Sequence, residues 1–444
     1  MERSDIIIIG GGPGGYEIAA ELADKGMKVT LIERDRLGGT CLNRGCIPTK
    51  CLCATAEAAL NARTSSALGI DVNGVSVNYE RARARMHEVV DGMRNGVQQM
   101  LSKVHVINGT ASINADGSVQ IGSMQLSADK VLIATGSAPA RLPIPGAEYA
   151  ATSDELLQED LPLPSRITII GGGVIGVEFA SIYAALGTDV TVLEYCKEIL
   201  PQFDGDIAKR LRVSLQSRGI KFVTGANVKS IASDRTVTYE TRRGEASVEA
   251  DMVLMATGRS PVLPDGLHEA GIELNNRGFI EVDERMCTTR PGFYAAGDVT
   301  GLCMLAHAAS AQARLALCED SDVDLNIIPS VVFCTPEAAM AGLTVADCER
   351  IGIECATARC NYAANGKAQA AGIASTGLVK LVYNPQTRLL LGAHVLGAHA
   401  SDLVAEAVAL MHGMVTIDEL ATDIVHAHPT LSELLPAAAR NASI

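Results

Sequence analysis

Two cysteines, Cys41 and Cys46, stand five positions apart in the segment GGTCLNRGCIPTK, residues 38–50. Sulfur atoms at this spacing can serve as metal ligands, as a structural disulfide, as ordinary buried thiols, or as a redox pair that opens and closes. Zinc sites usually combine a C-x-x-C pair with a second cluster, and this C-x4-C segment has neither. A metal site is therefore disfavoured, while a structural disulfide, buried thiols and a redox pair all stay open at this point.

One motif occurs twice in the chain. Residues 6–33 and 167–194 align without a gap and agree at 14 of 28 positions. Each copy reads as an apolar strand, a G-x-G-x-x-G turn, an amphipathic helix, a second apolar strand and a terminal glutamate. One such glycine turn is weak evidence, but two copies in the same register predict two dinucleotide-binding units.

The geometry of dinucleotide binding explains why both copies have glycine at these positions. The first two permit a tight turn and the close approach of a pyrophosphate, and the third lets the helix pack against the strand. The amides at the helix N-terminus then face the phosphates. The six positions are Gly10, Gly12 and Gly15 in the first copy and Gly171, Gly173 and Gly176 in the second.

A glutamate ends each copy, Glu33 in the first and Glu194 in the second. A carboxylate at this place can accept hydrogen bonds from a ribose 2′-hydroxyl, whereas it repels the 2′-phosphate of NADP. Two sites of this kind predict a flavin and a nicotinamide, with NAD favoured over NADP at the second site. The alternative for Glu194 is a solvated acid at a strand end.

Composition limits the class of protein. A chain of 444 residues is too long for one core, and 48% hydrophobic residues with 42 glycines are typical of a folded α/β enzyme. The net charge of -14 disfavours nucleic acid as a partner, because a phosphate backbone attracts a basic surface. Twelve cysteines in a chain without an evident leader or an apolar span of roughly 20 residues predict a cytoplasmic protein with mostly free thiols.

The motifs divide the chain into four segments. Residues 1–145 and 146–265 each end in an apolar strand, an ATG tripeptide and a proline-rich link, so we expect one dinucleotide-binding domain in each. Residues 266–327 contain a further pair of strands and should complete the first domain. Residues 328–444, which lack phosphate loops, read as strands joined by turns and one amphipathic helix, and predict a third domain of a different kind.

Seven motifs follow one another along the chain: GGGPGG, GGTCLNRGCIPTK, ATGS, GGGVIGVE, ATGR, AAGD and HAHPTLSE. In this order they resemble the flavoprotein pyridine-nucleotide disulfide oxidoreductases. The resemblance implies an α/β fold with two Rossmann-like domains, for FAD and NAD, and a C-terminal α+β dimerisation domain. It also implies a homodimeric enzyme that oxidises protein-bound dihydrolipoamide with NAD, and a lipoyl-bearing acyltransferase or glycine-cleavage carrier protein as its partner.

The resemblance also implies roles for particular residues. Cys41 and Cys46 would form the redox disulfide, with Cys41 similar to the thiol that exchanges with substrate and Cys46 to the thiolate that lies against the flavin. Lys50 resembles a lysine near the flavin N5 atom, paired with Glu178. Because Lys50 comes one helical turn after Cys46, both would lie on one face of a helix.

A histidine and a glutamate near the C-terminus, His428 and Glu433, resemble an acid-base pair that the other subunit provides. An imidazole with an ordinary pKa of about 6.5 can take a thiol proton and return it, and a carboxylate can fix its tautomer. His426 is then a packed or solvent-facing neighbour. His307 is expected to cap or pack near the flavin.

Further positions resemble cofactor contacts. Those expected at the FAD, beside the first glycine turn and Glu33, are Thr40, Lys50, Ala111, Ser137, Asp298 and Ala306. Those expected at the NAD, beside the second glycine turn and Glu194, are Val228 and Gly258. Asp298, at a strand end, can accept hydrogen bonds from a ribityl chain.

The remaining residues of the thiol segment and the rival reductases leave several questions open. Arg44, where well-known members of the family have valine, either favours the Cys46 thiolate or points to solvent, and Cys51 and Cys53 are expected to be ordinary helix residues.

Mercuric reductases and large thioredoxin reductases carry a C-terminal cysteine pair that this chain lacks, and Glu194 disfavours a glutathione reductase. A non-catalytic docking subunit would not need both cysteines together with the histidine and glutamate pair.

Overall fold

A sheet that is parallel except for β5, which pairs antiparallel with β4 and β6, forms the centre of the first part of the computed structural model, which describes residues 2–442. It is built on the isoleucine run of β1 (Glu2–Ile9). The four isoleucines of this strand are at most 4% exposed, as expected for a strand covered on both faces. The strand order is β3-β2-β1-β6-β5-β4, and β17 pairs with β6. The other strands are β2 (Val29–Glu33), β3 (His105–Asn108), β4 (Ala111–Ile113), β5 (Val119–Ile121), β6 (Met124–Ile133) and β17 (Phe293–Ala295).

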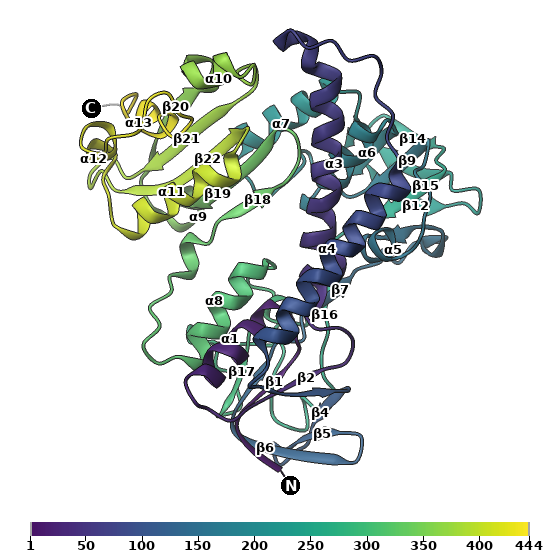
Figure 1. The fold of residues 1–444 in the computed structure, drawn as a ribbon, viewed down its shortest axis with the longest axis vertical. Helices are drawn as coiled ribbons and strands as arrows, with labels where there is room; N and C mark the ends of the chain where they lie inside the picture. The colour runs from purple at the N-terminus through teal and green to yellow at the C-terminus, as the bar shows by residue number, and fades with distance from the viewer. Residues whose placement is uncertain (1, 443–444) are drawn as a thin grey trace.

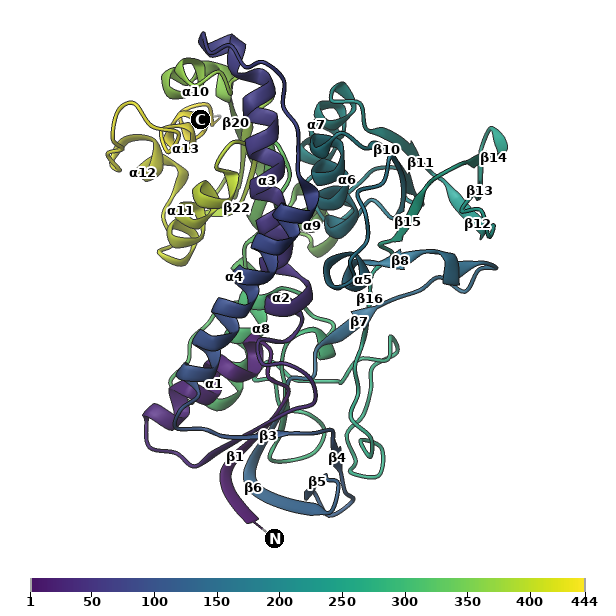
Figure 2. The same ribbon diagram turned by 45° about the vertical axis from the view of Figure 1, so that its right-hand side comes forward.

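The helices of this part place the thiol segment. Helix α1 (Pro13–Asp24) follows the first glycine turn and packs against α8 (Ala306–Leu317). The short helix α2 (Gly39–Arg44) leads into the long helix α3 (Cys46–Thr64), which packs on α4 (Tyr79–Met100). Both long helices run through the middle of the molecule in Figure 2. The thiol segment therefore lies near the centre of the molecule.

The second part repeats the parallel design. Its five-stranded sheet has the order β11-β10-β9-β15-β8, and a separate antiparallel sheet has the order β12-β13-β14. The strands are β8 (Ala151–Thr152), β9 (Arg166–Ile170), β10 (Asp189–Glu194), β11 (Lys221–Thr224), β12 (Asn227–Ile231), β13 (Val237–Thr241), β14 (Gly244–Val248) and β15 (Met252–Met255). The helices are α5 (Ser153–Gln158), α6 (Val174–Leu186) and α7 (Gly205–Ser217). A two-stranded link of β7 (Ser137–Pro139) and β16 (Arg259–Pro261) joins this part to the first.

The third part is an antiparallel sheet with helices, upper left in Figure 1. Its order is β18-β19-β22-β21-β20. The strands are β18 (Ser330–Val332), β19 (Glu337–Gly342), β20 (Ala356–Asn361), β21 (Leu378–Tyr383) and β22 (Leu390–Gly397). The helices are α9 (Val345–Ile351), α10 (Gly366–Ala370), α11 (Ala400–His412), α12 (Ile417–Thr422) and α13 (Leu434–Ala439). The predicted mixed α/β fold, with two parallel units and a C-terminal α+β unit, is confirmed.

Short 3-10 helices complete the structure at Ser65–Leu68, Ala147–Tyr149, Asp298–Thr300, Leu325–Ile327 and Tyr362–Ala364. Of the helices within residues 2–442, none combines the length and the apolar character needed to cross a membrane.

The segment 278–301 differs from the sequence expectation of a strand pair. Only β17 is a regular strand there, and Cys287 meets Tyr294 in an isolated bridge. The carboxylate of Asp283 accepts hydrogen bonds from the amides of Arg285 and Cys287. These two amides are therefore not available for hydrogen bonds between β-strands. The local side-chain turn therefore replaces the second strand.

A buried ion pair joins the second and third parts. Lys380 on β21 is 4% exposed, and its Nζ atom lies 2.7 Å from Asp204 and 2.8 Å from Asp206. Asp204 is itself 4% exposed and caps the N-terminus of α7. The charges of Lys380 and Asp204 are both buried away from water, so each needs the opposite charge to offset its lost hydration.

Replacing Lys380 by methionine should leave Asp204 buried without its cation. We expect the unfolding free energy to fall by about 3–5 kcal/mol, measured by urea denaturation. The matched control is Lys221→Met, which removes an exposed pair with Asp189 and should cost about 0–1 kcal/mol. Equal losses in the two variants would contradict the structural role of the buried pair.

Candidate active site

The two cysteines of the C-x4-C segment meet across a tight turn between α2 and α3. Gly45 separates the helices, and a Cβ atom built there would lie 2.9 Å from the carbonyl oxygen of Thr40 and 3.4 Å from Cα of Cys41. A glycine is therefore needed for the chain to fold back at this point. The fold brings Cys46 beside Cys41, so that each thiol shifts the pKa of the other.

The two thiols differ in acidity. The hydrogen bond from Cys41, supported by the positive charge of Lys50, lowers the pKa of Cys46 against the effect of burial. The same contact, together with burial, raises the pKa of Cys41. The pair therefore loses its first proton from Cys46, and the thiolate is the reactive form of a cysteine.

Lys50 and Glu178 form an ion pair where all three parts of the structure meet. The Nζ atom lies 3.1 Å from Oε1 and 3.2 Å from Oε2, and it lies 4.1 Å from the ring centroid of Phe333. The amide of Phe333 donates to Glu178 at 2.9 Å. Burial raises the pKa of Glu178, and the lysine opposes this shift. The predicted partners are thus brought together one helical turn from Cys46.

Arg44 has a different environment from either of the two that the sequence suggested. Its guanidinium lies 2.5 Å from Asp35 and 4.0 Å from Asp154, and its side chain is 24% exposed. The cation that lowers the pKa of Cys46 is Lys50. Two carboxylates therefore engage Arg44, which neither serves the thiolate nor points freely to solvent.

The remaining candidates of the thiol segment are packing residues, as expected. Cys51 is buried, and the thiol of Cys53 donates to the carbonyl oxygen of Phe333 at 3.2 Å. Burial raises the pKa of Cys53 to about 12. His307 hydrogen-bonds through Nε2 to the carbonyl oxygen of Pro329 at 2.7 Å. None of these contacts makes a reactive group.

His428 and Glu433 form a second pair in the C-terminal part. Nδ1 of the histidine lies 2.9 Å from Oε1 of the glutamate, and the amide of Thr430 donates to Oε2 at 2.9 Å. These two donors, the amide first, lower the pKa of Glu433. The imidazole is 79% exposed, and Nε2 has no hydrogen-bond partner within residues 2–442. His426 instead pairs with Glu406 at 2.5 Å and is 8% exposed.

Within one chain this histidine pair is separate from the thiols. Helices α12 and α13, which flank His428, lie at the upper left of Figure 2, whereas α2 lies in the middle. Among the described residues, no hydrogen bond or ion pair joins His428 to Cys41 or Cys46. The thiols and this histidine of one chain therefore lie in different parts of the molecule.

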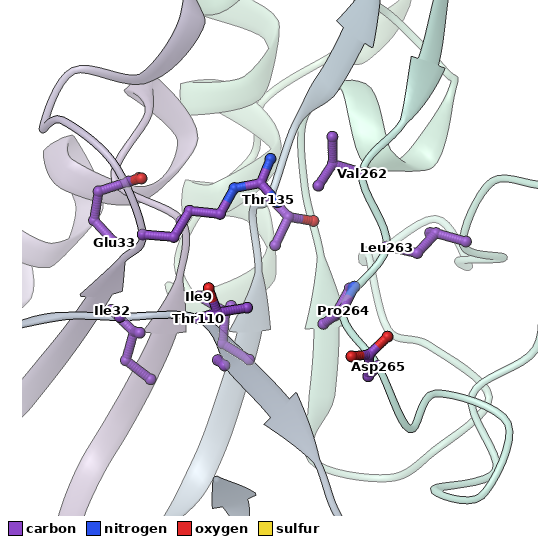
Figure 3. A pocket seen from close by; sticks show the side chains of 13 residues that line it. Ile9, Ile32, Glu33, Thr110, Thr135, Val262, Leu263, Pro264 and Asp265 are labelled. Carbon is purple, nitrogen blue, oxygen red and sulfur yellow. The ribbon is translucent and has the colours of Figure 1, made fainter. Parts of the chain in front are cut away.

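A cavity of about 190 Å³ opens where β1 and β2 end (Figure 3). It is lined by the predicted residues Gly10, Glu33 and Ala111. It is also lined by Thr135, which sequence reasoning missed although it is the middle residue of the first ATG motif. The hydroxyl of Thr135 is buried and has no hydrogen-bond partner among the described residues. This unpaired polar atom beside the carboxylate of Glu33 fits the adenosine part of FAD.

The first glycine turn leaves room for a pyrophosphate. Gly10 has φ +115°, and a Cβ atom there would come within 2.2 Å of the carbonyl oxygen of Ala134. A Cβ atom on Gly12 would meet nothing nearer than Cα of Gly39 at 3.8 Å. Glu33 accepts the amide of Gly11 at 2.6 Å, and its oxygens keep lone pairs for ribose hydroxyls. The residues present therefore fit FAD.

The second turn has the same geometry. Gly171 has φ +110°, with a Cβ position 2.3 Å from the carbonyl oxygen of Ala256, while the space around Gly173 is open to 4 Å. Glu194 accepts the amides of Gly172 at 2.5 Å and Cys196 at 2.6 Å. It is 6% exposed, so the interpretation as a solvated acid is wrong. This turn fits the nicotinamide dinucleotide.

The other residues predicted to contact a cofactor lie in or next to helices and strands of the first two parts. Ser137 donates to Asp298 at 2.5 Å and accepts from Arg259 at 2.7 Å. Sequence reasoning missed Arg259, although it ends the ATGR motif. The rest occupy these places: Thr40 in α2, Ala306 at the start of α8, Val228 in β12, Gly258 directly before β16, and Gly15 and Gly176 in α1 and α6.

Comparison with known proteins finds matches that together cover nearly the whole chain. Residues 4–313 match the family described as pyridine nucleotide-disulphide oxidoreductase, and residues 328–439 match the dimerisation domain of that family. The chain is similar to the dihydrolipoyl dehydrogenase of Chlamydia pneumoniae, with 36% identity over 98% of this chain and 95% of the relative. It is also similar to that of Synechocystis sp., with 38% identity over 99% of this chain and 98% of the relative.

A solved structure has the same fold. The HOCl-induced flavoprotein disulfide reductase RclA from Escherichia coli, solved as a Cu(II) complex, superimposes with a TM-score of 0.86. The two sequences are 30% identical, and the match covers 99% of each chain.

The difference in acidity between the two thiols can be tested in the reduced protein. In Cys41→Ala, Cys46 loses the neighbouring thiol that lowers its pKa, so the pKa of Cys46 should rise. The pH dependence of alkylation of Cys46 by iodoacetamide, followed by mass spectrometry, gives the midpoint. Cys53→Ala is the matched control and should leave the midpoint unchanged. An unchanged midpoint in Cys41→Ala would contradict the thiol contact.

Proposed function

The chain belongs to the pyridine nucleotide-disulphide oxidoreductase family, and we propose that it is a dihydrolipoamide dehydrogenase, an enzyme that oxidises protein-bound dihydrolipoamide to lipoamide and reduces NAD to NADH. FAD and NAD are the cofactors of this family of oxidoreductases. The observation that carries the proposal is the turn at Gly45, which places Cys41 and Cys46 side by side next to the ion pair of Lys50 and Glu178. The pKa values of the two thiols shift in opposite directions there.

In the proposed reaction, His428 takes a proton from a thiol of the dihydrolipoyl group. Its Nδ1 atom donates to Glu433, so Nε2 carries the free lone pair and is exposed to an incoming substrate. Deprotonation is needed because the thiolate, and not the thiol, attacks a disulfide.

The substrate thiolate then attacks the sulfur of Cys41 in the Cys41–Cys46 disulfide. A mixed disulfide forms, and Cys46 leaves as a thiolate, which is favoured because the more acidic thiol leaves faster. The second substrate thiol loses its proton and attacks the substrate sulfur bonded to Cys41. Cys41 leaves and accepts the proton held by His428. The products are lipoamide, a Cys41 thiol, a Cys46 thiolate and one released proton.

When bound, FAD supplies the two-electron relay between the reduced cysteines and NAD. We assign its adenosine part to the cavity beside Glu33 and Thr135, and NAD to the turn beside Glu194. Lys50 holds a positive charge beside the thiols and is itself held by Glu178. Ser137 donates to Asp298, and we propose that both residues contact FAD together with Ala306 at the start of α8.

The dimerisation domain makes the protein a homodimer. We propose that His428 serves Cys41 of the partner subunit, which is consistent with its exposure and its distance from the thiols of its own chain. A lipoyl-bearing acyltransferase or a glycine-cleavage carrier protein would deliver the substrate. A cytoplasmic location belongs to the same proposal and is supported by the twelve cysteines, which suit a reducing compartment.

A second candidate is a related flavoprotein disulfide reductase, because the match to RclA from Escherichia coli also covers nearly the whole chain. Steady-state rates with dihydrolipoamide and with reduced glutathione, each with NAD and with NADP, separate the two. We expect dihydrolipoamide with NAD to be the best pair, with kcat/KM for NAD about 100-fold above that for NADP, because Glu194 repels a 2′-phosphate. A preference for glutathione or for NADP would favour the second candidate.

Replacing His428 by glutamine should lower the rate of dihydrolipoamide oxidation by about 10²–10⁴-fold, because the substrate thiol loses its base. Reduction of the bound flavin by NADH should continue, since this half of the reaction does not use the histidine. Stopped-flow absorbance measures both. The control variant, His412→Gln, changes an exposed histidine at the end of α11 and should leave both rates unchanged. Equal loss in both half-reactions would contradict the assigned role.

A further inference from the structure

Phe333 contacts the ion pair of Lys50 and Glu178 with its ring and with its main chain. The centroid of the ring lies 4.1 Å from Nζ of Lys50. The amide donates to Oε1 of Glu178 at 2.9 Å, and the carbonyl oxygen accepts from the thiol of Cys53 at 3.2 Å. Lys50 and Cys53 lie on α3 and Glu178 on α6, whereas Phe333 directly follows β18 in the third part. One residue of the third part therefore touches both helices that carry the ion pair beside the thiols.

The main chain on both sides of this ring is anchored. Strand β18 ends at Val332, which is fully buried, and the strand packs against α6. On the other side of the ring, the amide of Thr335 donates to the hydroxyl of Ser181 on α6 at 3.1 Å. The ring of Phe333 thus belongs to a segment, residues 332–335, that hydrogen bonds and packing hold against α3 and α6.

The ring covers one side of a charge that sits on a flexible side chain. A lysine ammonium is strongly hydrated and is carried by a four-carbon stem with several rotatable bonds. The side chain of Lys50 is 33% exposed, and its Nζ atom lies 3.1 and 3.2 Å from the two carboxylate oxygens of Glu178. The negative face of an aromatic ring attracts a cation within about 6 Å. The ring of Phe333 therefore stabilises the ammonium on a second side and keeps water away from that side.

The place of this charge matters for the thiol one helical turn away. Cys46 is the first residue of α3 and Lys50 follows it by four positions, so the two side chains project from one face of the helix. A cation favours a thiolate, but salt screens an exposed charge over about 10 Å. A lysine that turned into solvent would therefore lose most of its influence on the sulfur.

We propose that Phe333 is a positioning residue of the redox site, whose ring holds the ammonium of Lys50 beside Cys46. The dimerisation domain then acts on the thiols of its own chain, in addition to the role proposed for His428. The inference rests on the redox role of Cys46 in the proposed function, but it does not depend on which substrate the enzyme oxidises. It is consistent with the lowered pKa of Cys46, to which Lys50 contributes.

Two chemical labels on the reduced holoenzyme test this without any substrate. The protein is reduced with dithiothreitol under anaerobic conditions, and separate samples receive a brief pulse of acetic anhydride or of iodoacetamide at pH 7. Mass spectrometry after digestion gives the rate of acetylation of Lys50 and the rate of alkylation of Cys46. Because no substrate is used, a wrong assignment of the substrate would leave both measurements unaffected.

In Phe333→Leu, which keeps an apolar side chain but removes the aromatic face, the two rates should move in opposite directions. We expect acetylation of Lys50 to rise about threefold, because the ammonium is less stabilised and less covered. Alkylation of Cys46 should fall about threefold, because the thiolate loses part of its nearby positive charge. A loss of packing alone would expose both side chains and raise both rates.

Three further variants complete the test. Phe333→Met, with an apolar side chain of similar length, should give the same two changes, and Phe333→Tyr, which keeps the ring, should restore both wild-type rates. The matched control is Phe203→Leu, which removes a buried ring before α7 in the second part and should leave both rates unchanged. The proposal is overturned if alkylation of Cys46 does not fall in the folded leucine and methionine variants, or if the tyrosine variant behaves as they do.

Discussion

The buried carboxylate of Glu178 sets the geometry on which the rest of the site depends. A charge removed from water is costly unless a partner compensates it, and Lys50 with the amide of Phe333 supplies that compensation. Because Lys50 lies on α3 and Glu178 on α6, the ion pair holds the start of α3 against the second part of the molecule. Cys46, the first residue of α3, is held there with it.

The thiol chemistry follows from this placement. Gly45 lets the chain fold back so that Cys41 lies beside Cys46, and the positive charge of Lys50 also lowers the pKa of Cys46. Two chemically identical side chains thus become unequal, one more acidic and one less acidic than an ordinary cysteine. This inequality gives the proposed disulfide exchange its direction, because the more acidic sulfur is the better leaving group.

The molecule uses one nucleotide-binding design twice, and the histidine that we propose for proton transfer lies in a different part of the structure. In both copies the terminal glutamate accepts an amide of the glycine turn, Gly11 for Glu33 and Gly172 for Glu194, which aligns the carboxylate with the turn. His428 lies in the third part, exposed and held only by its own loop. We propose that the second chain of the homodimer completes this arrangement by covering the histidine.

The sequence by itself determined the features that local geometry controls. The glycine turns could be read because only glycine tolerates the positive φ and the close backbone contacts at Gly10 and Gly171. The contact of Cys41 with Cys46, and that of His428 with Glu433, span only five positions each. The pairing of Lys50 with Glu178 was expected from a resemblance, since no local rule connects residues 128 positions apart.

Tertiary structure alone decided what Arg44 contacts, because Asp35 and Asp154 reach it from different parts of the chain. It also decided that Thr135 faces the cavity with a hydroxyl that has no partner among the described residues. The predicted strand pair near Asp283 failed because a side-chain turn competed with the ladder. These outcomes depend on which elements pack together, and burial and hydrogen bonding between distant segments carry no periodic signal in the sequence.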